Sequence, residues 1–259
     1  MACYVGIDVG SVATKGVVIH DGLMVFYHVI PSGFNYGAAA ETMRRELLAK
    51  AGVSVDQVDG IVTTGCGAAS APFESQQASE IVCCARGAER IFPSVKTVIS
   101  VGGQSSQVVR IGRGGKVADF VVSERCAAGS ARFLQVMANV LRVDLADIGE
   151  LSLRSRAPVS FSTGCAVFGE TEAITRVAEG FPVEDILAGV HQSLAGKIAS
   201  LVSKIGPAGE CALCGGGALD IGLVRALEDT LGLRLLVPEQ PQSVTALGAA
   251  VLSQSSGAF

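Results

Sequence analysis

The chain has 259 residues, of which 49% are hydrophobic and 17% are charged, with 32 glycines and no tryptophan. This composition is typical of an α/β protein with buried strands and many tight turns. The formal net charge of −4 does not indicate a nucleic-acid or acidic-membrane partner. The first apolar run contains Asp8 and lacks a basic leader, and no apolar stretch approaches the roughly 20 residues that span a bilayer. We therefore expect a cytoplasmic protein without a signal peptide or a membrane segment.

The first half of the chain predicts three strands joined by tight turns, followed by alternating helices and a strand. The turn between the second and third strands is the dipeptide Asp21-Gly22, and a further glycine-rich turn is expected at 65–67. The expected strands are 4–9, 16–19, 24–30 and 60–64, and the expected helices lie near 38–50 and 75–91.

The three-strand pattern then occurs a second time, which predicts an internal duplication. A shift of 92 residues places Ile7 on Ile99, Val9 on Val101, Gly10 on Gly102, Ile19 on Ile111 and Gly22 on Gly114. The second set of strands is expected at 97–101, 108–111 and 116–122. The same shift places Asp8 on Ser100, so the two copies differ at the end of their first strand.

Each copy has a glycine-rich elbow after its first strand, and we interpret the paired elbows as phosphate-binding turns. Gly10 in the first elbow and Gly102-Gly103 in the second offer unobstructed backbone N–H groups, which suit phosphate oxygens. Asp8 is placed to hold a hydrated magnesium ion, and Lys15 is placed to offset phosphate charge. One such turn alone is weak support, because tight hairpins use the same residues.

The second half predicts further α/β elements and a third glycine-rich loop at 215–217. Glycines between a buried strand and a helix allow a base or ribose to lie against the backbone, but the same pattern fits close helix–strand packing. The expected elements are strands at 159–161, 211–214 and 234–237, and helices at 183–205, after Asp220, and from Thr245 onward.

Two of the eight cysteines lie in distinctive motifs, CAAGSARFL at 126–134 and STGCAVFGETE at 162–172. We expect Cys126 and Cys165 just ahead of helices, with Thr163 as the N-cap of the second helix. A helix start favours the thiolate, which is the form that metals and iron–sulfur clusters bind. Two ligands are too few for a four-cysteine cluster, although a two-fold dimer would supply four. From spacing alone, both cysteines are better interpreted as small buried residues.

The other cysteines are interpreted as packing residues, because a cytoplasmic chain rarely builds a disulfide framework. Cys211 and Cys214 have the spacing of a zinc or redox pair, but no second pair follows them. They are expected on a buried strand, and Cys83-Cys84 is expected on a helix. The three histidines share no metal spacing, and Glu170 and Glu172 are expected either to order a loop near the nucleotide or to lie on a solvated helix face.

Taken together, these pieces resemble the actin, hexokinase and chaperone-ATPase superfamily. The two cysteine motifs resemble one branch of it, which contains the ATP-dependent activators of 2-hydroxyacyl-CoA dehydratases and the ATP-binding subunits of benzoyl-CoA reductase. The resemblance implies an α/β, ribonuclease H-like fold with two lobes, a duplicated β-β-β-α unit and an interlobe nucleotide cleft. The lobes would be 1–95, completed by the helix at 246–259, and 96–245.

The resemblance also implies an ATP hydrolase coupled to electron transfer, with ATP or ADP and Mg²⁺ as ligands. One 4Fe–4S cluster per dimer would be ligated by Cys126 and Cys165 of each chain. Hydrolysis would depend on Asp8, which holds Mg²⁺ through water, and on Gln104. The expected nucleotide-binding residues are Gly10, Ser11, Val12, Ala13, Thr14, Lys15, Gly102, Gly103, Gln104, Gly215, Gly216, Gly217 and Ala218. The implied partners are a second or homologous subunit, an iron–sulfur acyl-CoA dehydratase or reductase, and a donor such as ferredoxin or flavodoxin.

Three residues depart from the pattern of this branch. Ser100 and Ser105 stand where the branch has aspartates, and Gly164 replaces a bulkier residue before Cys165. The two serines predict slow ATP hydrolysis, because they remove carboxylates from the second elbow. Two alternatives therefore stay open. One is a nucleotide-binding subunit of a heterodimeric reductase, and the other is a small-molecule kinase with Asp119 or Glu124 as its base.

Overall fold

The structure is a computed structural model that describes residues 2–124, 126–162 and 165–256. Its internal contacts divide the chain into two compact units. The first unit comprises Met1–Val98, Val109–Asp119 and Pro238–Phe259, and the second comprises Ile99–Val108 and Phe120–Val237. Within the described ranges, no helix is long and apolar enough to cross a membrane.

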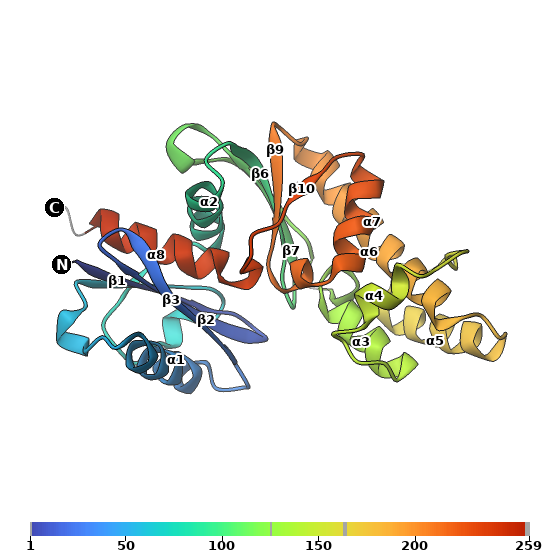
Figure 1. Ribbon diagram of the computed structural model, residues 1–259, viewed down its shortest axis with the longest axis horizontal. Helices are drawn as coiled ribbons and strands as arrows, with labels where there is room; N and C mark the ends of the chain where they lie inside the picture. Colours follow the sequence, from blue (N-terminus) through green and yellow to red (C-terminus); the bar gives the residue numbers. More distant parts are fainter. Residues whose placement is uncertain (1, 125, 163–164, 257–259) are drawn as a thin grey trace. The chain divides into compact units, whose positions relative to one another are not determined.

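The first sheet has five strands in the order β3-β2-β1-β4-β5. They are β1 (Cys3–Val9), β2 (Ala13–His20), β3 (Leu23–Pro31), β4 (Gly60–Thr64) and β5 (Gln76–Gln77). Strands β1 and β2 pair antiparallel, whereas β1 and β4 pair parallel, so the sheet is mixed. Helix α1 (Tyr36–Ala51) packs on one face and α8 (Val244–Ser256) on the other, next to α2 (Glu80–Ile91) (Figure 1).

The sequence explains the boundaries of α1 in local terms. The Asn35 side chain accepts a hydrogen bond from the Ala38 backbone N–H at 3.0 Å and caps the helix start. Gly52 ends the helix in the left-handed region, with φ of 68°. Met43 and Leu47 are fully buried and pack α1 against the apolar core under β1. Capping and one apolar stripe are therefore enough to specify this helix.

Helix α8 approaches both its neighbours through glycines. A Cβ atom on Gly6 of β1 would lie next to the Ala246 carbonyl oxygen of α8. A Cβ atom on Gly248 of α8 would lie on the Cys83 carbonyl oxygen of α2. Only glycine allows backbones this close, so these positions fix the spacing of the sheet, α8 and α2.

The second sheet repeats the strand order of the first. Its order is β10-β9-β6-β7-β8, which matches β5-β4-β1-β2-β3 strand for strand. The strands are β6 (Val95–Val101), β7 (Ser106–Ile111), β8 (Val117–Val122), β9 (Glu210–Cys214) and β10 (Leu235–Leu236). This correspondence confirms the duplication predicted from the sequence.

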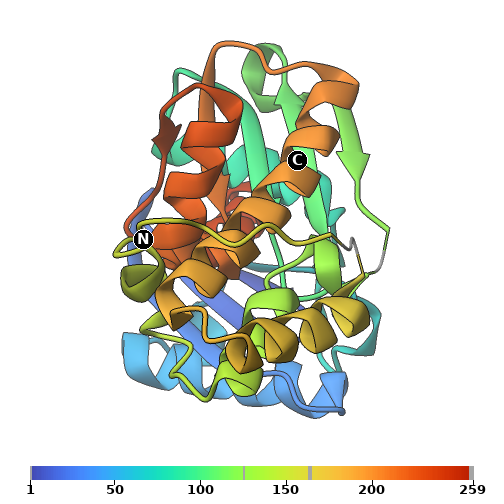
Figure 2. The same cartoon turned by 90° about the vertical axis from the view of Figure 1, so that its right-hand side faces the viewer.

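The second unit contains five α-helices within the described residues. They are α3 (Arg132–Leu141), α4 (Ile148–Ser152), α5 (Ala166–Ala178), α6 (Val183–Ile205) and α7 (Ile221–Leu231). Figure 2 shows α6 crossing the unit, and α3, α5 and α7 all contact it. Its buried face includes Ile186, Leu194 and Ile198, so α6 forms the centre of this core.

Short 3₁₀ turns occur in both units. Those described are η1 (Val55–Gln57), η2 (Ala68–Ser70), η3 (Arg113–Gly115), η4 (Ala127–Gly129), η5 (Gly216–Leu219) and η6 (Pro241–Ser243).

Three predicted elements need correction, and one short helix was not predicted. The helix expected at 75–91 begins at Glu80, because Gln76–Gln77 instead pairs with β4 as β5. The segment 159–161 is not a strand, since the Val159 N–H donates to the Asp185 carbonyl of α6 at 2.9 Å. The strand expected at 234–237 is reduced to β10, and the short helix α4 was not predicted.

Candidate functional site

The first elbow contains a buried ion pair between the two ends of one hairpin. The β1–β2 register places Asp8 opposite Lys15, and Lys15 Nζ lies 2.9 Å from Asp8 Oδ2. Burial lowers the pKa of Lys15, but the charge of Asp8 and the hydrogen bond to it raise that pKa by more. Lys15 therefore stays protonated at neutral pH.

The chain between β1 and β2 is held by a serine that sequence reasoning missed. Ser32 is buried, its hydroxyl donates to the Gly10 carbonyl at 2.7 Å, and its N–H donates to the Val12 carbonyl at 3.0 Å. The Thr14 hydroxyl lies 2.8 Å from the Ser32 hydroxyl. A Cβ atom on Gly10 would lie 2.8 Å from Lys15 Nζ, so a larger residue there would displace the cation. The expected residues at 10–15 thus form one connected turn, with Ser11 and Ala13 partly exposed and Val12 exposed.

The glycine-rich turn at 65–67 packs against the carboxylate of Asp8. Gly65 has φ of 87°, and a Cβ atom there would overlap Asp8 Oδ1 and the Val9 carbonyl oxygen. The Cys66 thiol is exposed and donates to that Val9 carbonyl at 3.6 Å. The predicted turn at 65–67 is therefore present and packs against the first elbow. Among the described residues, no three His, Cys, Asp or Glu side chains gather as a metal site.

The second elbow is also a closed turn, but it carries no ion pair. The Gly102 N–H donates to the Ser105 carbonyl at 3.0 Å. Ser100 is buried at the end of β6, which is the place that Asp8 occupies on β1. Gly103 is partly exposed and Gln104 is exposed. The two elbows are alike in backbone and unlike in charge.

Cys126 is exposed, so the interpretation of this residue as a small buried one is wrong. It does not directly precede α3, as the sequence predicted. The turn η4 follows it, and α3 begins six positions later at Arg132. The small residues at 127–131 fill this turn and bring the segment against the second elbow, where the Ala131 N–H donates to the Gly102 carbonyl at 2.9 Å.

Cys165 is itself the N-cap of α5 and is partly exposed, so it is not a buried residue either. The backbone N–H groups of Phe168 and Val167 at the helix start lower its pKa, and the charge of Lys197 lowers it further. This is the electrostatic effect expected at a helix start. Thr163, the predicted N-cap, and Gly164 lie outside the described residues, and the N-cap position belongs to Cys165.

Helix α6 carries a cation, Lys197, whose pKa depends on the charges of both thiols. Lys197 Nζ lies 5.9 Å from the centroid of the buried Phe133 ring of α3. Burial lowers the pKa of Lys197, and the charges of Cys126 and Cys165 oppose that effect. Both cysteines are therefore within electrostatic reach of one ammonium group. Sequence reasoning missed this cation, because Lys197 is distant from both motifs along the chain.

A glutamate on α5 binds Ser162, which lies three positions before Cys165. Glu172 accepts hydrogen bonds from the Ser162 N–H at 3.0 Å and the Ser162 hydroxyl at 3.1 Å. Arg176 lies 3.5 Å from the same carboxylate. Of the two glutamates considered from the sequence, Glu172 thus holds the backbone and side chain of Ser162.

The third glycine-rich loop packs closely on β6. Gly215 has φ of 86°, and a Cβ atom there would lie 2.5 Å from the Val101 carbonyl oxygen. A Cβ atom on Gly217 would lie 2.5 Å from the Val101 side chain. Close packing therefore explains these two glycines, whereas Gly216 is partly exposed and Ala218 is buried.

A buried pair that the sequence did not reveal closes this loop. Asp220 caps α7 by accepting the Leu223 N–H at 2.9 Å. The fully buried His191 of α6 lies 3.1 Å from the Asp220 carboxylate. The pair joins the end of the loop to the central helix of the unit.

The remaining cysteines considered as possible ligands are packing residues. Cys211 and Cys214 are buried on β9, as predicted. Cys83 and Cys84 are buried on α2, and burial raises the pKa of Cys83 to about 11. A thiol with such a pKa stays protonated at neutral pH and is a poor metal ligand.

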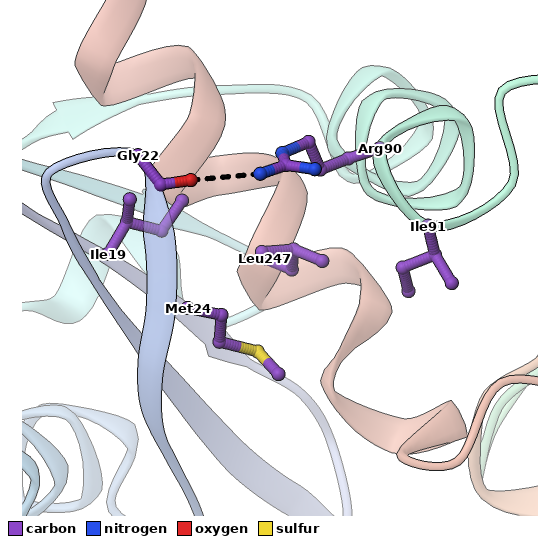
Figure 3. A pocket seen from close by; sticks show the side chains of 6 residues that line it. All are labelled: Ile19, Gly22, Met24, Arg90, Ile91 and Leu247. Atoms are coloured by element: carbon purple, nitrogen blue, oxygen red, sulfur yellow. Dashed lines mark hydrogen bonds between the residues drawn. The ribbon is translucent and has the colours of Figure 1, made fainter.

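A shallow pocket of about 260 Å³ lies elsewhere in the first unit (Figure 3). Its walls come from β2, β3, α2 and α8, and the Arg90 guanidinium there donates to the Gly22 carbonyl at 2.8 Å. The lining residues are Ile19, Gly22, Met24, Arg90, Ile91 and Leu247. None of the predicted binding residues is among them.

The chain is similar to proteins of one family over nearly all its length. The model of the BadF/BadG/BcrA/BcrD ATPase family matches residues 5–253. The 2-hydroxyisocaproyl-CoA dehydratase activator of Clostridioides difficile is 37% identical over 247 residues, covering 95% of this chain and 92% of the relative. The (R)-2-hydroxyglutaryl-CoA dehydratase activating ATPase of Acidaminococcus fermentans is 35% identical over 255 residues, covering 98% and 97%. A benzoyl-CoA reductase subunit of Thauera aromatica is 35% identical over 193 residues, covering 74% and 68%.

Solved structures give the same assignment. The C. difficile activator with bound ADPNP superposes with a TM-score of 0.94 at 36% identity, covering 98% of this chain and 95% of that one. A glucokinase from Streptomyces griseus, at 13% identity and a TM-score of 0.61, shares the fold alone. The fold is therefore the predicted actin/hexokinase-like α/β fold, with two mixed five-stranded sheets. The chain belongs to the BadF/BadG/BcrA/BcrD ATPase family.

Proposed function

We propose that this protein is an ATP-dependent activator that passes single electrons to an iron–sulfur enzyme acting on an acyl-CoA. The observation that carries the proposal is the pair of accessible thiols, Cys126 and Cys165, within electrostatic reach of one cation in a chain of this ATPase family. A kinase of the same fold has no use for such a pair. The named relatives include activators of acyl-CoA dehydratases and a component of a benzoyl-CoA reductase, which supports the class of partner.

The residues present fit half of a 4Fe–4S site. Cys165 has a pKa lowered by the backbone N–H groups at the start of α5 and by Lys197, which favours the thiolate that iron requires. Two cysteines per chain leave two irons without a protein ligand, so we propose that Cys126 and Cys165 of two copies complete one cluster. The cluster would supply a low-potential one-electron carrier, whose electron comes from a reduced ferredoxin or flavodoxin.

We further propose that the two elbows bind the nucleotide phosphates and that the loop at 215–218 receives its base. Lys15 supplies a permanent positive charge, and Gly10 and Gly102 lie in turns whose geometry only small residues allow. Asp8 would accept hydrogen bonds from the water shell of Mg²⁺, and Gln104 would orient the attacking water. The energy of ATP binding and hydrolysis would then drive an electron transfer that is otherwise unfavourable.

One observation favours a second candidate, a nucleotide-binding subunit with weak hydrolysis of its own. Ser100 is buried where the first elbow has Asp8, so the second elbow contributes no carboxylate to the metal. A homologous subunit with that carboxylate would supply the stronger activity in a heterodimer. The kinase candidate is disfavoured, because a kinase has no use for the paired cysteines, and because Asp119, one of its two candidate bases, pairs with Arg110 at 3.3 Å.

The deciding experiment is an anaerobic count of iron and sulfide per chain, combined with the mass of the oligomer. We expect four irons and four sulfides per dimer, with Cys126→Ser or Cys165→Ser each removing them. Cys214→Ser is the matched control, because Cys214 is buried on β9 and should leave the iron content unchanged. A wild-type dimer without iron, or a Cys214→Ser variant that alone loses it, would refute the assignment.

A further inference from the structure

The chain segment that follows Cys126 is tied to the second elbow by hydrogen bonds from buried groups. Ser106 and Ser130 both have no exposed surface, so water cannot replace the bonds of their hydroxyls. The contacts are Ala131 N–H to the Gly102 carbonyl at 2.9 Å, Ser106 Oγ to the Gly129 carbonyl at 2.7 Å, and Ser130 Oγ to the Gly103 carbonyl at 3.4 Å.

The Ser130 hydroxyl has two carbonyl acceptors, one in the elbow and one in η4. One is the Gly103 carbonyl of the elbow, at 3.4 Å, and the other is the Ala127 carbonyl of η4, at 3.1 Å. A hydroxyl carries one hydrogen, so it donates fully to one carbonyl at a time. The shorter distance favours Ala127 in this structure. Ser130 is therefore poised between the elbow and the turn that carries Cys126.

On the cysteine side, the same residue closes η4. The Ser130 N–H donates to the Ala127 carbonyl at 3.1 Å, and the Gly129 N–H donates to the Cys126 carbonyl at 3.0 Å. These bonds fix the direction in which Cys126 leaves the turn. A change in the Ala127–Ser130 contact would thus alter the presentation of the exposed Cys126 thiol.

On the elbow side, the rotation of a planar peptide moves its N–H and its carbonyl together. The Gly103 carbonyl shares its peptide plane with the Gln104 N–H, and the Gly102 carbonyl shares its plane with the Gly103 N–H. An N–H that turns toward a phosphate oxygen necessarily turns the carbonyl of the same peptide. Those two carbonyls are the acceptors for Ser130 and Ala131.

We propose that Ser130 is a positioning residue that transmits the occupancy of the second elbow by a nucleotide phosphate to Cys126. The inference rests on the proposed function, because it takes the second elbow as a phosphate site. It concerns a buried hydroxyl rather than a residue that touches nucleotide or metal. A neutral hydrogen bond can shift a two-state equilibrium by about fivefold, which sets the scale of the effect.

The test measures the rate at which iodoacetamide alkylates Cys126 in the full reduced, iron-free chain, followed by peptide mass spectrometry. The rate is compared without nucleotide and with saturating Mg-ADPNP. We expect the nucleotide to change the wild-type rate by about fivefold, and Ser130→Ala to reduce that change to less than about 1.5-fold. The rise in melting temperature caused by the nucleotide should persist in Ser130→Ala, since the nucleotide contacts remain.

Ser152→Ala is the matched control. Ser152 is also buried in the second unit and donates to a backbone carbonyl at 2.8 Å, that of Gly149, but it lies outside the elbow and the Cys126 turn. It should keep the wild-type response. Ser106→Ala breaks the neighbouring link to Gly129 and should weaken the response, which provides a second test if Ser130→Ala is poorly folded.

The outcomes separate this inference from the proposed function. A wild-type chain whose melting temperature rises with nucleotide, but whose Cys126 rate does not change, overturns the inference and leaves nucleotide binding intact. A full response in both Ser130→Ala and Ser106→Ala overturns it too. A wild-type chain with no rise in melting temperature contradicts the proposed function itself.

Discussion

The effect of a Gly→Ala change inside a helix on stability depends on whether the new methyl group has space, and the glycine of α8 allows this to be tested. Alanine is favoured over glycine inside a helix by about 1 kcal/mol, so Gly→Ala is stabilising where a methyl group fits. At Gly248 it does not fit, because the new Cβ would overlap the Cys83 carbonyl oxygen and lie 2.6 Å from the Cys83 carbonyl carbon. Ordinary carbon contacts are about 3.5–4.0 Å, so α8 and α2 would have to separate by more than about 1 Å, since the carbonyl oxygen is closer still.

Overpacking of this kind costs about 3 kcal/mol, and the helix preference of alanine returns about 1 kcal/mol. The net loss of about 2 kcal/mol should lower the melting temperature by roughly 4–8 °C in a chain of this size. Gly196→Ala is the matched control, because Gly196 also lies inside a helix and its Cβ would meet no atom within 4 Å. We expect that variant to melt about 1–4 °C higher than the wild type. Thermal unfolding followed by circular dichroism measures both. If Gly248→Ala melts at or above the wild-type temperature, the contact of α8 with α2 is not as close as described.

Three further predictions concern the site. ATP or ADP with magnesium, at roughly 100 times its dissociation constant, should stabilise the chain by about 2.7 kcal/mol, and Gly216→Val should abolish the resulting rise in melting temperature. Ser100→Asp should raise the rate of ATP hydrolysis and Asp8→Asn should lower it, because phosphoryl transfer depends on positioned charge; a brisk wild-type ATPase that Ser100→Asp leaves unchanged would contradict this. Lys197→Met should slow alkylation of Cys165 at neutral pH by about twofold or more, since the cation helps to lower the pKa of that thiol. Lys204→Met, with the same loss of charge on an exposed part of α6, should have no such effect.

Local sequence signals were sufficient for much of the fold. Helix α6 has the predicted bounds, because Pro182 precedes it and Gly206 ends it. The duplicated strands were predictable because each is a short apolar run between turn residues. The helix at 75–91 was predicted five residues too long at its start, since β5 forms only by pairing with β4, which is distant in the sequence.

The candidate site was likewise predictable only where its residues are contiguous in the sequence. Glycine elbows and cysteine motifs are visible in the sequence because each is contiguous. Ser32, Ser130 and His191 are not visible, because each is defined by a partner brought close only by the fold. The exposure of Cys126 and Cys165 was also unpredictable, since small neighbouring residues fit a buried turn as well as an open one.

The position of α8 has a consequence for the order in which the chain folds. The apolar side chains of Val17 and Ile19 on β2 are covered by Ala246 and Ala250 of α8, which follow them by more than 200 residues. During synthesis, the N-terminal sheet therefore emerges without the helix that covers one of its faces. The second unit, formed by residues 99–108 and 120–237, is released in full before α8. We thus expect the second unit to become resistant to protease first in ribosome-bound chains, and the N-terminal sheet only after residue 256 has left the exit tunnel.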